Sequence, residues 1–227
     1  MSPRIARRKF FLTKNHIKAR KNFAKKYISW SSEDWRKVLF TDESKINMFS
    51  SDGREWIWRF KGEEFDPDLI DIKIKHSQSI MIWCSISYSG VGSLVFIEKK
   101  MDKYLFLRIL KNNLLKDAER LIGDDFYFQQ DNDPKHKSDI VQDWIIKKGI
   151  DMIKWPANSP DMSPIENCFH FLKKSLGSNH FTSKDDFKEK ILKNWKEIPL
   201  DYLRNLYNSM EDHIESLHRA KGHQTKF

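Results

Sequence analysis

Residues 126–155 read FYFQQDNDPKHKSDIVQDWIIKKGIDMIKW, and this stretch indicates the fold class. Its opening aromatic run predicts a strand over 126–131, and the run MIKW predicts a short strand over 152–155. The segment between them predicts a helix near 137–148. A strand, a helix and a second strand in this order favour an α/β sheet whose faces are covered by helices.

Five short β-prone runs lie upstream: VLFTD (38–42), KINMF (45–49), REWIWRF (54–60), SIMIWCSISY (79–88) and GSLVFIE (92–98). Ser- and Gly-containing segments separate the first three, which we expect to form separate strands of a meander, with a hairpin at 51–53. A helix is predicted over 102–121. The expected fold is α/β, with a mixed sheet in a ribonuclease H-like layout. Many other α/β folds share this order of elements, so the layout alone does not decide the family.

Three prolines within Pro156–Pro164 exclude regular structure there. A helix is expected to start at Ser163–Pro164, because Ser is a favourable N-cap and Pro is favourable at the first helical position. Two amphipathic helices, over 183–197 and 200–220, form a predicted C-terminal helical extension.

The charge of the chain points to a polyanionic partner. Among its 227 residues, 41 Lys and Arg outweigh 32 Asp and Glu, for a net charge of +9. No acidic residue precedes Glu33, whereas many basic residues do, in part on a helix predicted over 14–28. Such a block is typical either of a nucleic-acid arm or of a solvated helix face. The candidates for nucleic-acid contact here are Arg7, Arg8, Lys9, Lys14 and Lys18.

Two features bear on compartment. Cys84 and Cys168 are the only cysteines, which gives neither a disulfide framework nor a metal knuckle and suits a reducing environment. The longest apolar stretch, near 79–88, is too short to span a bilayer, and no signal peptide is evident. We therefore expect a soluble intracellular protein without a membrane partner.

Three acidic residues occupy positions where ligands are expected. Asp42 follows the apolar run 38–41, Asp131 follows the run 126–130, and Glu166 falls in the first turn of the helix after Pro164. Carboxyl ends of strands in α/β sheets face the crevice in which ligands bind, and a helix N-terminus can face the same crevice.

Carboxylates in one cleft suit phosphoryl transfer. Displacement at a phosphodiester places charge on the attacking and the leaving oxygen, which two Mg²⁺ ions about 3.5–4 Å apart can stabilise. Mg²⁺ prefers oxygen ligands from few carboxylates. Each acid alone has an ordinary interpretation as a turn residue, a cap or a charge near a helix dipole. The residues themselves therefore leave both possibilities open.

Three blocks closely resemble the catalytic blocks of Tc/mariner transposases: VLFTDESKINMFSSDGREWIWR (38–59), FQQDNDPKHKS (128–138) and WPANSPDMSPIEN (155–167). The 34 residues of 132–165 between the second Asp and the Glu resemble the spacing of one branch of this family. The similarity continues through 18–38 and through 198–227, so it covers essentially the whole chain.

The resemblance implies a DDE catalytic domain of ribonuclease H-like fold, with Asp42, Asp131 and Glu166 as catalytic, metal-binding triad. It implies two Mg²⁺ or Mn²⁺ ions and no small-molecule cofactor, with water cleaving at transposon ends and the resulting 3′-hydroxyl attacking target DNA. Double-stranded DNA, a homodimer and a nuclear location follow as expectations. Lys135, His136 and Lys137 are further candidates for DNA contact, although His136 is equally well interpreted as a polar residue at a helix start.

We expect three segments: a basic helix and linker (1–35), the catalytic domain (36–181) and C-terminal helices that pack on it (182–227). Family members begin with a helix-turn-helix domain, of which at most the trailing edge is expected here. Ser163 and Cys168–Phe169 depart from the Asn and Leu–Trp common in the family. The alternatives are a truncated or domesticated DNA-binding remnant without activity, and a non-transposing nuclease on the same fold.

Overall fold

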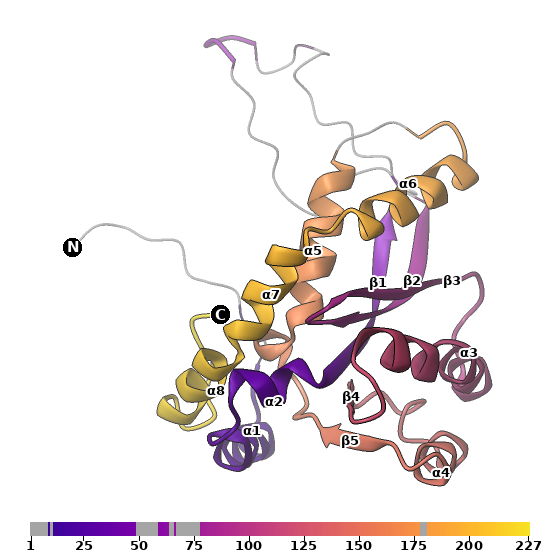
Figure 1. Cartoon of the computed structure of the whole chain (residues 1–227). Coiled ribbons are helices and arrows are strands. Elements are labelled where there is room, and N and C mark those ends of the chain that lie inside the picture. The colour runs from indigo at the N-terminus through magenta and orange to yellow at the C-terminus, as the bar shows by residue number, and fades with distance from the viewer. Residues whose placement is uncertain (1–8, 10, 49–58, 64–65, 67–77, 178–180) are drawn as a thin grey trace.

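The computed structural model describes residues 9, 11–48, 59–63, 66, 78–177 and 181–227. A five-stranded mixed sheet lies at its centre, in the order β3-β2-β1-β4-β5 (Figure 1). The strands are β1 (Val38–Asn47), β2 (Ser79–Ser87), β3 (Gly90–Ile97), β4 (Tyr127–Gln130) and β5 (Asp151–Lys154). The β1–β2 and β2–β3 pairs are antiparallel, whereas β1–β4 and β4–β5 are parallel. This sheet confirms the predicted α/β class.

Helices cover both faces of the sheet. They are α1 (Lys14–Tyr27), α2 (Ser32–Arg36), α3 (Lys103–Leu121), α4 (Asp139–Lys147), α5 (Pro164–Leu176), α6 (Lys184–Lys196), α7 (Leu200–Asn208) and α8 (Met210–Arg219), with a short 3₁₀ turn η2 (Pro160–Met162). The predicted helices over 14–28, 102–121 and 183–197 are confirmed to within two residues at each end. None of the helices in the described part of the chain is long and apolar enough to cross a membrane.

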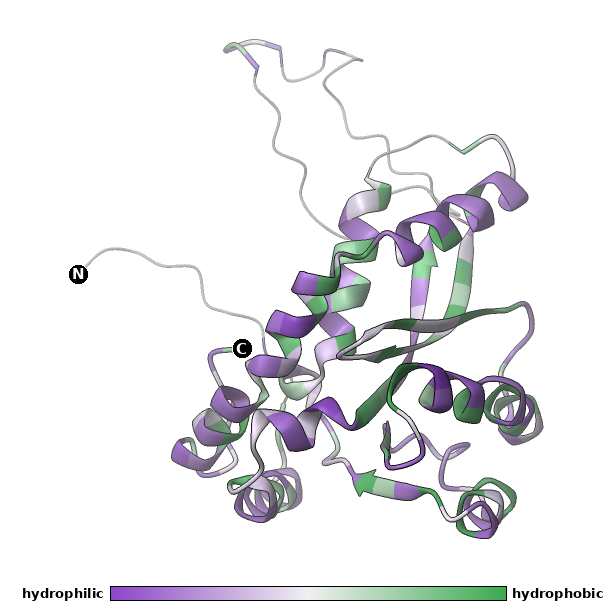
Figure 2. Ribbon diagram, viewed as in Figure 1, coloured by the Kyte–Doolittle hydropathy of each residue, from purple (hydrophilic) through white to green (hydrophobic). Residues whose placement is uncertain are grey.

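Alternation along β1 creates two hydrophobic cores. Val38 and Phe40 face the larger core, which contains residues of α1, α2 and α5–α8. Leu39 faces the second core, together with α3 and α4. The helices show hydrophilic and hydrophobic sides, and strands such as β1 and β5 combine hydrophobic with hydrophilic segments (Figure 2). Because successive side chains of a strand point to opposite faces, Asp42 lies on the α5 side of the sheet and Glu43 on the α3 side.

The prediction of separate strands at 38–42 and 45–49 was wrong, because residues 38–47 form one strand. β2 pairs with β1 without interruption from Phe40, opposite Ile86, to Asn47, opposite Ser79. Backbone pairing along this length keeps Glu43–Ser44–Lys45 extended, although their polarity suggested a turn. The predicted hairpin at 51–53 and residues 54–58 of the predicted strand 54–60 lie outside the described residues, and Arg59–Phe60 are not in a strand.

The single helix expected over 200–220 is also interrupted. Ser209 ends α7 and precedes α8, with φ −80° and ψ −5°, and its hydroxyl donates to the Leu206 carbonyl at 2.8 Å. The turn redirects the chain so that α8 packs against α1, next to α7 (Figure 1). Apolar spacing continues through this turn, so hydrophobic periodicity alone does not locate it.

Candidate active site

The three predicted carboxylates line one pocket with a volume of about 380 Å³. Asp42 lies within β1, Asp131 directly follows β4, and Glu166 is in the first turn of α5. The pairing of β4 with β1 ends at Gln129–Phe40, so β1 continues past the end of its neighbour. Asp42 therefore lies beside the carboxyl end of β4, at the edge of the sheet where α/β proteins form a ligand-binding crevice. The remaining lining residues are Gln129, Asn132, Asp133, Trp155–Pro160 and Ser163.

The charges in this pocket repel one another. Burial raises the pKa of Asp42 well above its ordinary value, and the negative charges of Glu166, Glu43 and Asp131 raise it further. Burial also raises the pKa of Glu166. A divalent cation between these carboxylates would offset both effects, since it favours their charged forms. The all-oxygen donor set and the room in the pocket fit a hard cation such as Mg²⁺ or Mn²⁺.

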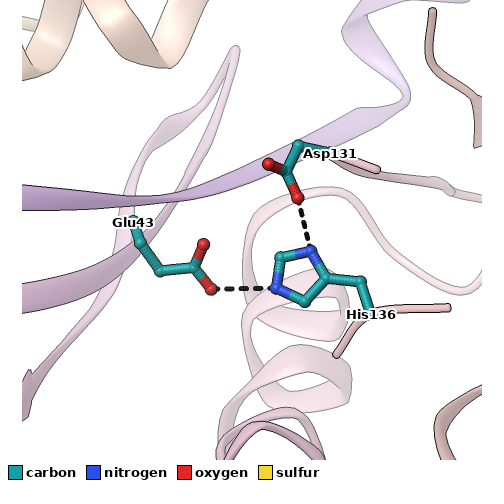
Figure 3. Close-up of side chains that lie close together, drawn as sticks. All are labelled: Glu43, Asp131 and His136. Carbon is teal, nitrogen blue, oxygen red and sulfur yellow. Dashed lines mark hydrogen bonds and ion pairs between the residues drawn. The ribbon is translucent and has the colours of Figure 1, made fainter. Parts of the chain in front are cut away.

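Asp131 is held from outside the pocket by His136 (Figure 3). The Nδ1 atom of His136 lies 2.5 Å from Oδ1 of Asp131, and its Nε2 lies 3.1 Å from Oε1 of Glu43. The imidazole is buried and stacks on Phe106 at 3.9 Å between ring centroids. Burial lowers the pKa of His136, but the bonds to Asp131 and Glu43 outweigh it and raise the pKa to about 9. The protonated ring therefore donates from Nε2 to Glu43 and forms an ion pair with Asp131 through Nδ1.

Glu43, Asp131 and His136 are the one group of three in the described residues whose potential metal ligands all lie within 4.8 Å of one another. In the metal-free chain the raised pKa keeps both ring nitrogens of His136 protonated at neutral pH, so the ring then offers no lone pair. Without a metal, this group is therefore an ion-pair network. Its effect on Asp131 is direct: although burial raises the pKa of this carboxyl, His136 and the Asp133 backbone N–H hold it below its ordinary value.

The predicted DNA-contacting residues differ in their exposure and in their partners. Lys14, Lys18 and Lys137 are exposed, whereas His136 is buried and is not at the surface. Lys135 is engaged by Asp133 at 2.6 Å and by Glu43 at 3.9 Å. Lys9 donates to the carbonyl of Phe227. Arg7 and Arg8 lie outside the described residues.

Two local expectations need correction. Ser163 occupies the N-cap position of α5, but its hydroxyl makes no capping bond and is buried without a hydrogen-bond partner in the described structure. Pro164 alone therefore supplies the favourable start. Asp133, whose place just ahead of the helix predicted near 137–148 suggests a helix cap, does not cap α4: its Oδ1 accepts from the backbone N–H of Lys135 at 2.9 Å and closes the turn before that helix.

Comparison with known proteins identifies the family. Residues 37–188 match the family described as DDE superfamily endonuclease. The Tc1 transposase of Caenorhabditis elegans is 33% identical over 221 residues, covering 97% of this chain and 81% of the relative. The Tcb1 transposase of Caenorhabditis briggsae is 35% identical over 211 residues, covering 92% of this chain and 77% of the relative.

The chain belongs to the Tc1/mariner transposases of the DDE endonuclease superfamily.

Solved structures of this family share the fold. The Mos1 transposase paired-end complex with left transposon end superposes with a TM-score of 0.88 at 16% identity, covering all of this chain and 68% of that one. The Mos1 catalytic domain with raltegravir and Mg gives 0.75 at 16% identity, covering 96% of this chain and 100% of that one. The ribonuclease H-like fold expected from the sequence is therefore confirmed.

Within this DDE transposase domain, sequence reasoning missed Glu43. Glu43 follows Asp42 directly and lies in the segment that the sequence predicted to separate two strands. One signal was available: in a continuous strand, neighbouring acids point to opposite faces. Glu43 therefore cannot point into the same pocket as Asp42, and it needs a charge partner on the opposite face of the sheet.

Proposed function

We propose that this transposase domain catalyses divalent-metal-dependent cleavage of DNA at transposon ends and transfer of the resulting 3′-hydroxyl to target DNA. One observation carries the proposal: carboxylates from β1, the end of β4 and the start of α5 line a single open pocket. Asp42, Asp131 and Glu166 are the proposed catalytic residues.

These three residues would hold two Mg²⁺ or Mn²⁺ ions. When bound, such a pair stabilises the charge on the attacking and leaving oxygens of a phosphodiester. Asp131 enters this arrangement already ionised and oriented, because the His136 imidazolium, which does not line the pocket, forms an ion pair with its Oδ1. Asp42 and Glu166 supply the remaining charge, and their raised pKa values indicate that binding of cations and full ionisation are coupled.

Several exposed cations support binding of the DNA backbone. Lys137 and Lys154 line a second pocket, of about 270 Å³, that shares Asp131 and Asn132 with the first. A phosphate neighbouring the scissile one would find these ammonium groups beside the carboxylates. Lys14 and Lys18 add charge on the exposed side of α1. A dimer that pairs two DNA ends, in the nucleus, belongs to the same proposal; the Mos1 paired-end complex supports, by analogy, the binding of transposon ends.

A plasmid-nicking assay tests the proposal. Supercoiled DNA is incubated with the chain in Mg²⁺, Mn²⁺ or EDTA, and relaxation is followed over time. We expect metal-dependent nicking that falls at least about a hundredfold in Asp131→Ala and in Glu166→Gln, because several kcal/mol of charge stabilisation is lost. Asp143→Asn is the matched control, since it removes a carboxylate from the exposed side of α4.

Equal nicking by Asp131→Ala and the unaltered chain would reject the assignment of the triad. DNA binding without nicking in any divalent metal would favour the alternative, an inactive DNA-binding remnant.

A further inference from the structure

Arg20, on α1, is a buried cation that does not belong to the carboxylate triad. Although it belongs to the basic N-terminal block, its side chain is only 1% exposed, so it is neither part of a DNA arm nor of a solvated face. Its Nη1 and Nη2 atoms bind the two carboxylate oxygens of Asp161, each at 2.7 Å. This bidentate geometry is typical of a guanidinium paired with a carboxylate.

The same guanidinium holds the loop that forms one wall of the catalytic pocket. Nη1 of Arg20 also donates to Oγ of Ser159 at 2.8 Å and to the carbonyl of Asn158 at 3.3 Å. Asn158 has a left-handed backbone (φ 55°), which is sparsely populated outside glycine. Its Nδ2 lies within 3.1 Å of Nδ1 of His16 on α1. Helix α1 thus holds the strained residue by both its backbone and its side chain.

A second set of bonds ties this loop to the C-terminal segment. Nε of Arg20 donates to the carbonyl of Gly222 at 3.0 Å, and Nη2 donates to that of His223 at 3.2 Å. Thr225 donates to Oδ2 of Asp161 at 2.9 Å. Gly222 has φ 89°, and a Cβ there would lie 2.3 Å from the carbonyl oxygen of Ile17, so only glycine permits this approach.

The held loop leads directly into the helix that carries Glu166. Ser159 and Pro160 line the catalytic pocket, Asp161 lies in η2, and Glu166 follows in the first turn of α5. The carbonyl of Asp161 also lies 3.1 Å from Nδ1 of His213 on α8. The loop is therefore fixed at both its side chains and its backbone before α5 begins.

We propose that Arg20 is a positioning residue for catalysis, which holds the 157–161 loop and the start of α5 so that Glu166 reaches the pocket shared with Asp42 and Asp131. The proposal rests on the proposed function for its effect on DNA cleavage. Arg20 touches neither the reacting atoms nor the triad, and acts through Asp161 and Ser159. A small displacement of a metal-binding carboxylate is enough to slow chemistry by one to two orders of magnitude.

Two conservative substitutions separate positioning from charge. Arg20→Lys keeps the cation but loses the fork, and Asp161→Asn keeps the shape but loses the anion. Lys25→Gln is a charge control from the exposed side of the same helix, and Tyr207→Phe is a stability control that loses a buried hydrogen bond to the sheet and none to the loop. All variants are measured well below their unfolding temperatures.

The first readout is hydrogen–deuterium exchange, which does not depend on activity. In Arg20→Lys and Asp161→Asn we expect the amides of 157–166 to exchange at least about tenfold faster, with β2 and β3 unchanged. The second readout is plasmid nicking at saturating Mn²⁺, expected to fall about ten- to a hundredfold while the Kd for DNA changes less than twofold.

Protection of 157–166 equal to that of the unaltered chain would overturn the proposal. So would faster exchange without a change in nicking rate, or the same pattern in Tyr207→Phe. If the unaltered chain does not nick DNA in any divalent metal, the proposed function fails, and the exchange comparison still decides whether Arg20 holds the loop.

Discussion

Replacement of Asp42 by Asn is expected to stabilise the metal-free protein while removing its response to divalent metal. The pKa of Asp42 is raised by burial and by the charges of Glu166 and Glu43. A carboxyl whose pKa is higher in the folded than in the unfolded chain destabilises the fold as pH rises through the interval between the two values. At pH 7 the neutral amide avoids this cost, and its oxygen can still accept the 2.7 Å bond from the Glu43 backbone N–H.

The expected size of the metal response follows from linkage. A cation at one hundred times its Kd stabilises the folded state by about 2.7 kcal/mol. For a chain of this size, each kcal/mol raises Tm by about 2–4 °C, so the unaltered protein is expected to gain about 5–11 °C. Asp42→Asn is expected to gain less than about half of that, because one charged ligand is lost.

Thermal unfolding followed by circular dichroism at pH 7, in EDTA and across a Mn²⁺ titration, measures both quantities. Asp143→Asn again serves as control, because its carboxylate is exposed on α4. The reasoning is refuted if Asp42→Asn melts below the unaltered protein in EDTA and still gains the full shift in Mn²⁺. That result would mean that Asp42 contributes a structural bond and that metal binds elsewhere.

Three further outcomes follow. Asp161→Asn is expected to cost about 3–5 kcal/mol at pH 7, since it leaves Arg20 buried without its partner. Burial raises the pKa of Asp161, but Arg20 and Thr225 outweigh it and hold the pKa below its ordinary value. The difference in unfolding free energy between the unaltered protein and Asp161→Asn should therefore shrink as pH falls below about 4. A difference that stays constant with pH would contradict this reasoning. Tyr207→Phe is expected to lower the free energy of urea unfolding by about 1–2 kcal/mol, because the buried hydroxyl donates to the Ile86 carbonyl at 2.8 Å. An unchanged free energy of unfolding would mean that this hydrogen bond does not stabilise the fold. Lys137→Gln is expected to weaken DNA binding regardless of sequence and to lower the salt slope by about 1, whereas an unchanged slope would place phosphate elsewhere.

The convergence of the triad was predictable from the sequence because it depends on topology. Strand ends of an α/β sheet and the following helix N-terminus meet at one edge, so the positions of Asp131 and Glu166 followed once the β4–α4–β5 unit was recognised. The number of residues between Asp131 and Glu166, together with the sequence blocks around them, indicated the family. The side-chain geometry that tunes these acids did not follow, since His136 becomes buried only when α3 places Phe106 against it.

Polarity misled the prediction of β1. Asp42, Glu43 and Ser44 interrupt an apolar run, and such an interruption usually marks a turn. In this protein the polar residues are there because the strand passes through the active site, with Asp42 directed to the pocket and Glu43 to His136. The failure of the hydrophobic pattern thus coincides with the functional residues, as expected where chemistry requires groups that packing alone would exclude.

Arg20 shows the converse case, in which a charge pattern concealed a structural residue. Ile17, Arg20, Ala24 and Tyr27 share one helical stripe at spacings of three and four, and that stripe faces the core. A cation on the buried stripe of a helix needs an anion within reach, and the partner proved to be Asp161 in the loop beside the pocket. The sequence analysis assigned Arg20 to the basic block and did not predict its burial; its partner, 141 residues away in sequence, required the structure.

The arrangement explains how a site of mutually repelling acids persists in a folded chain. Burial raises the pKa of Asp42 and of Glu166, so the surrounding elements have to fix these carboxylates in the metal-free chain without help from a ligand. Asp131 is held by His136, and Asp42 by the paired length of β1. Glu166 follows an irregular loop at the start of a helix, so it is held neither by His136 nor by pairing within the sheet. The Arg20 network supplies it from the first helix and the C-terminal segment, which makes the two ends of the described chain part of the active-site architecture.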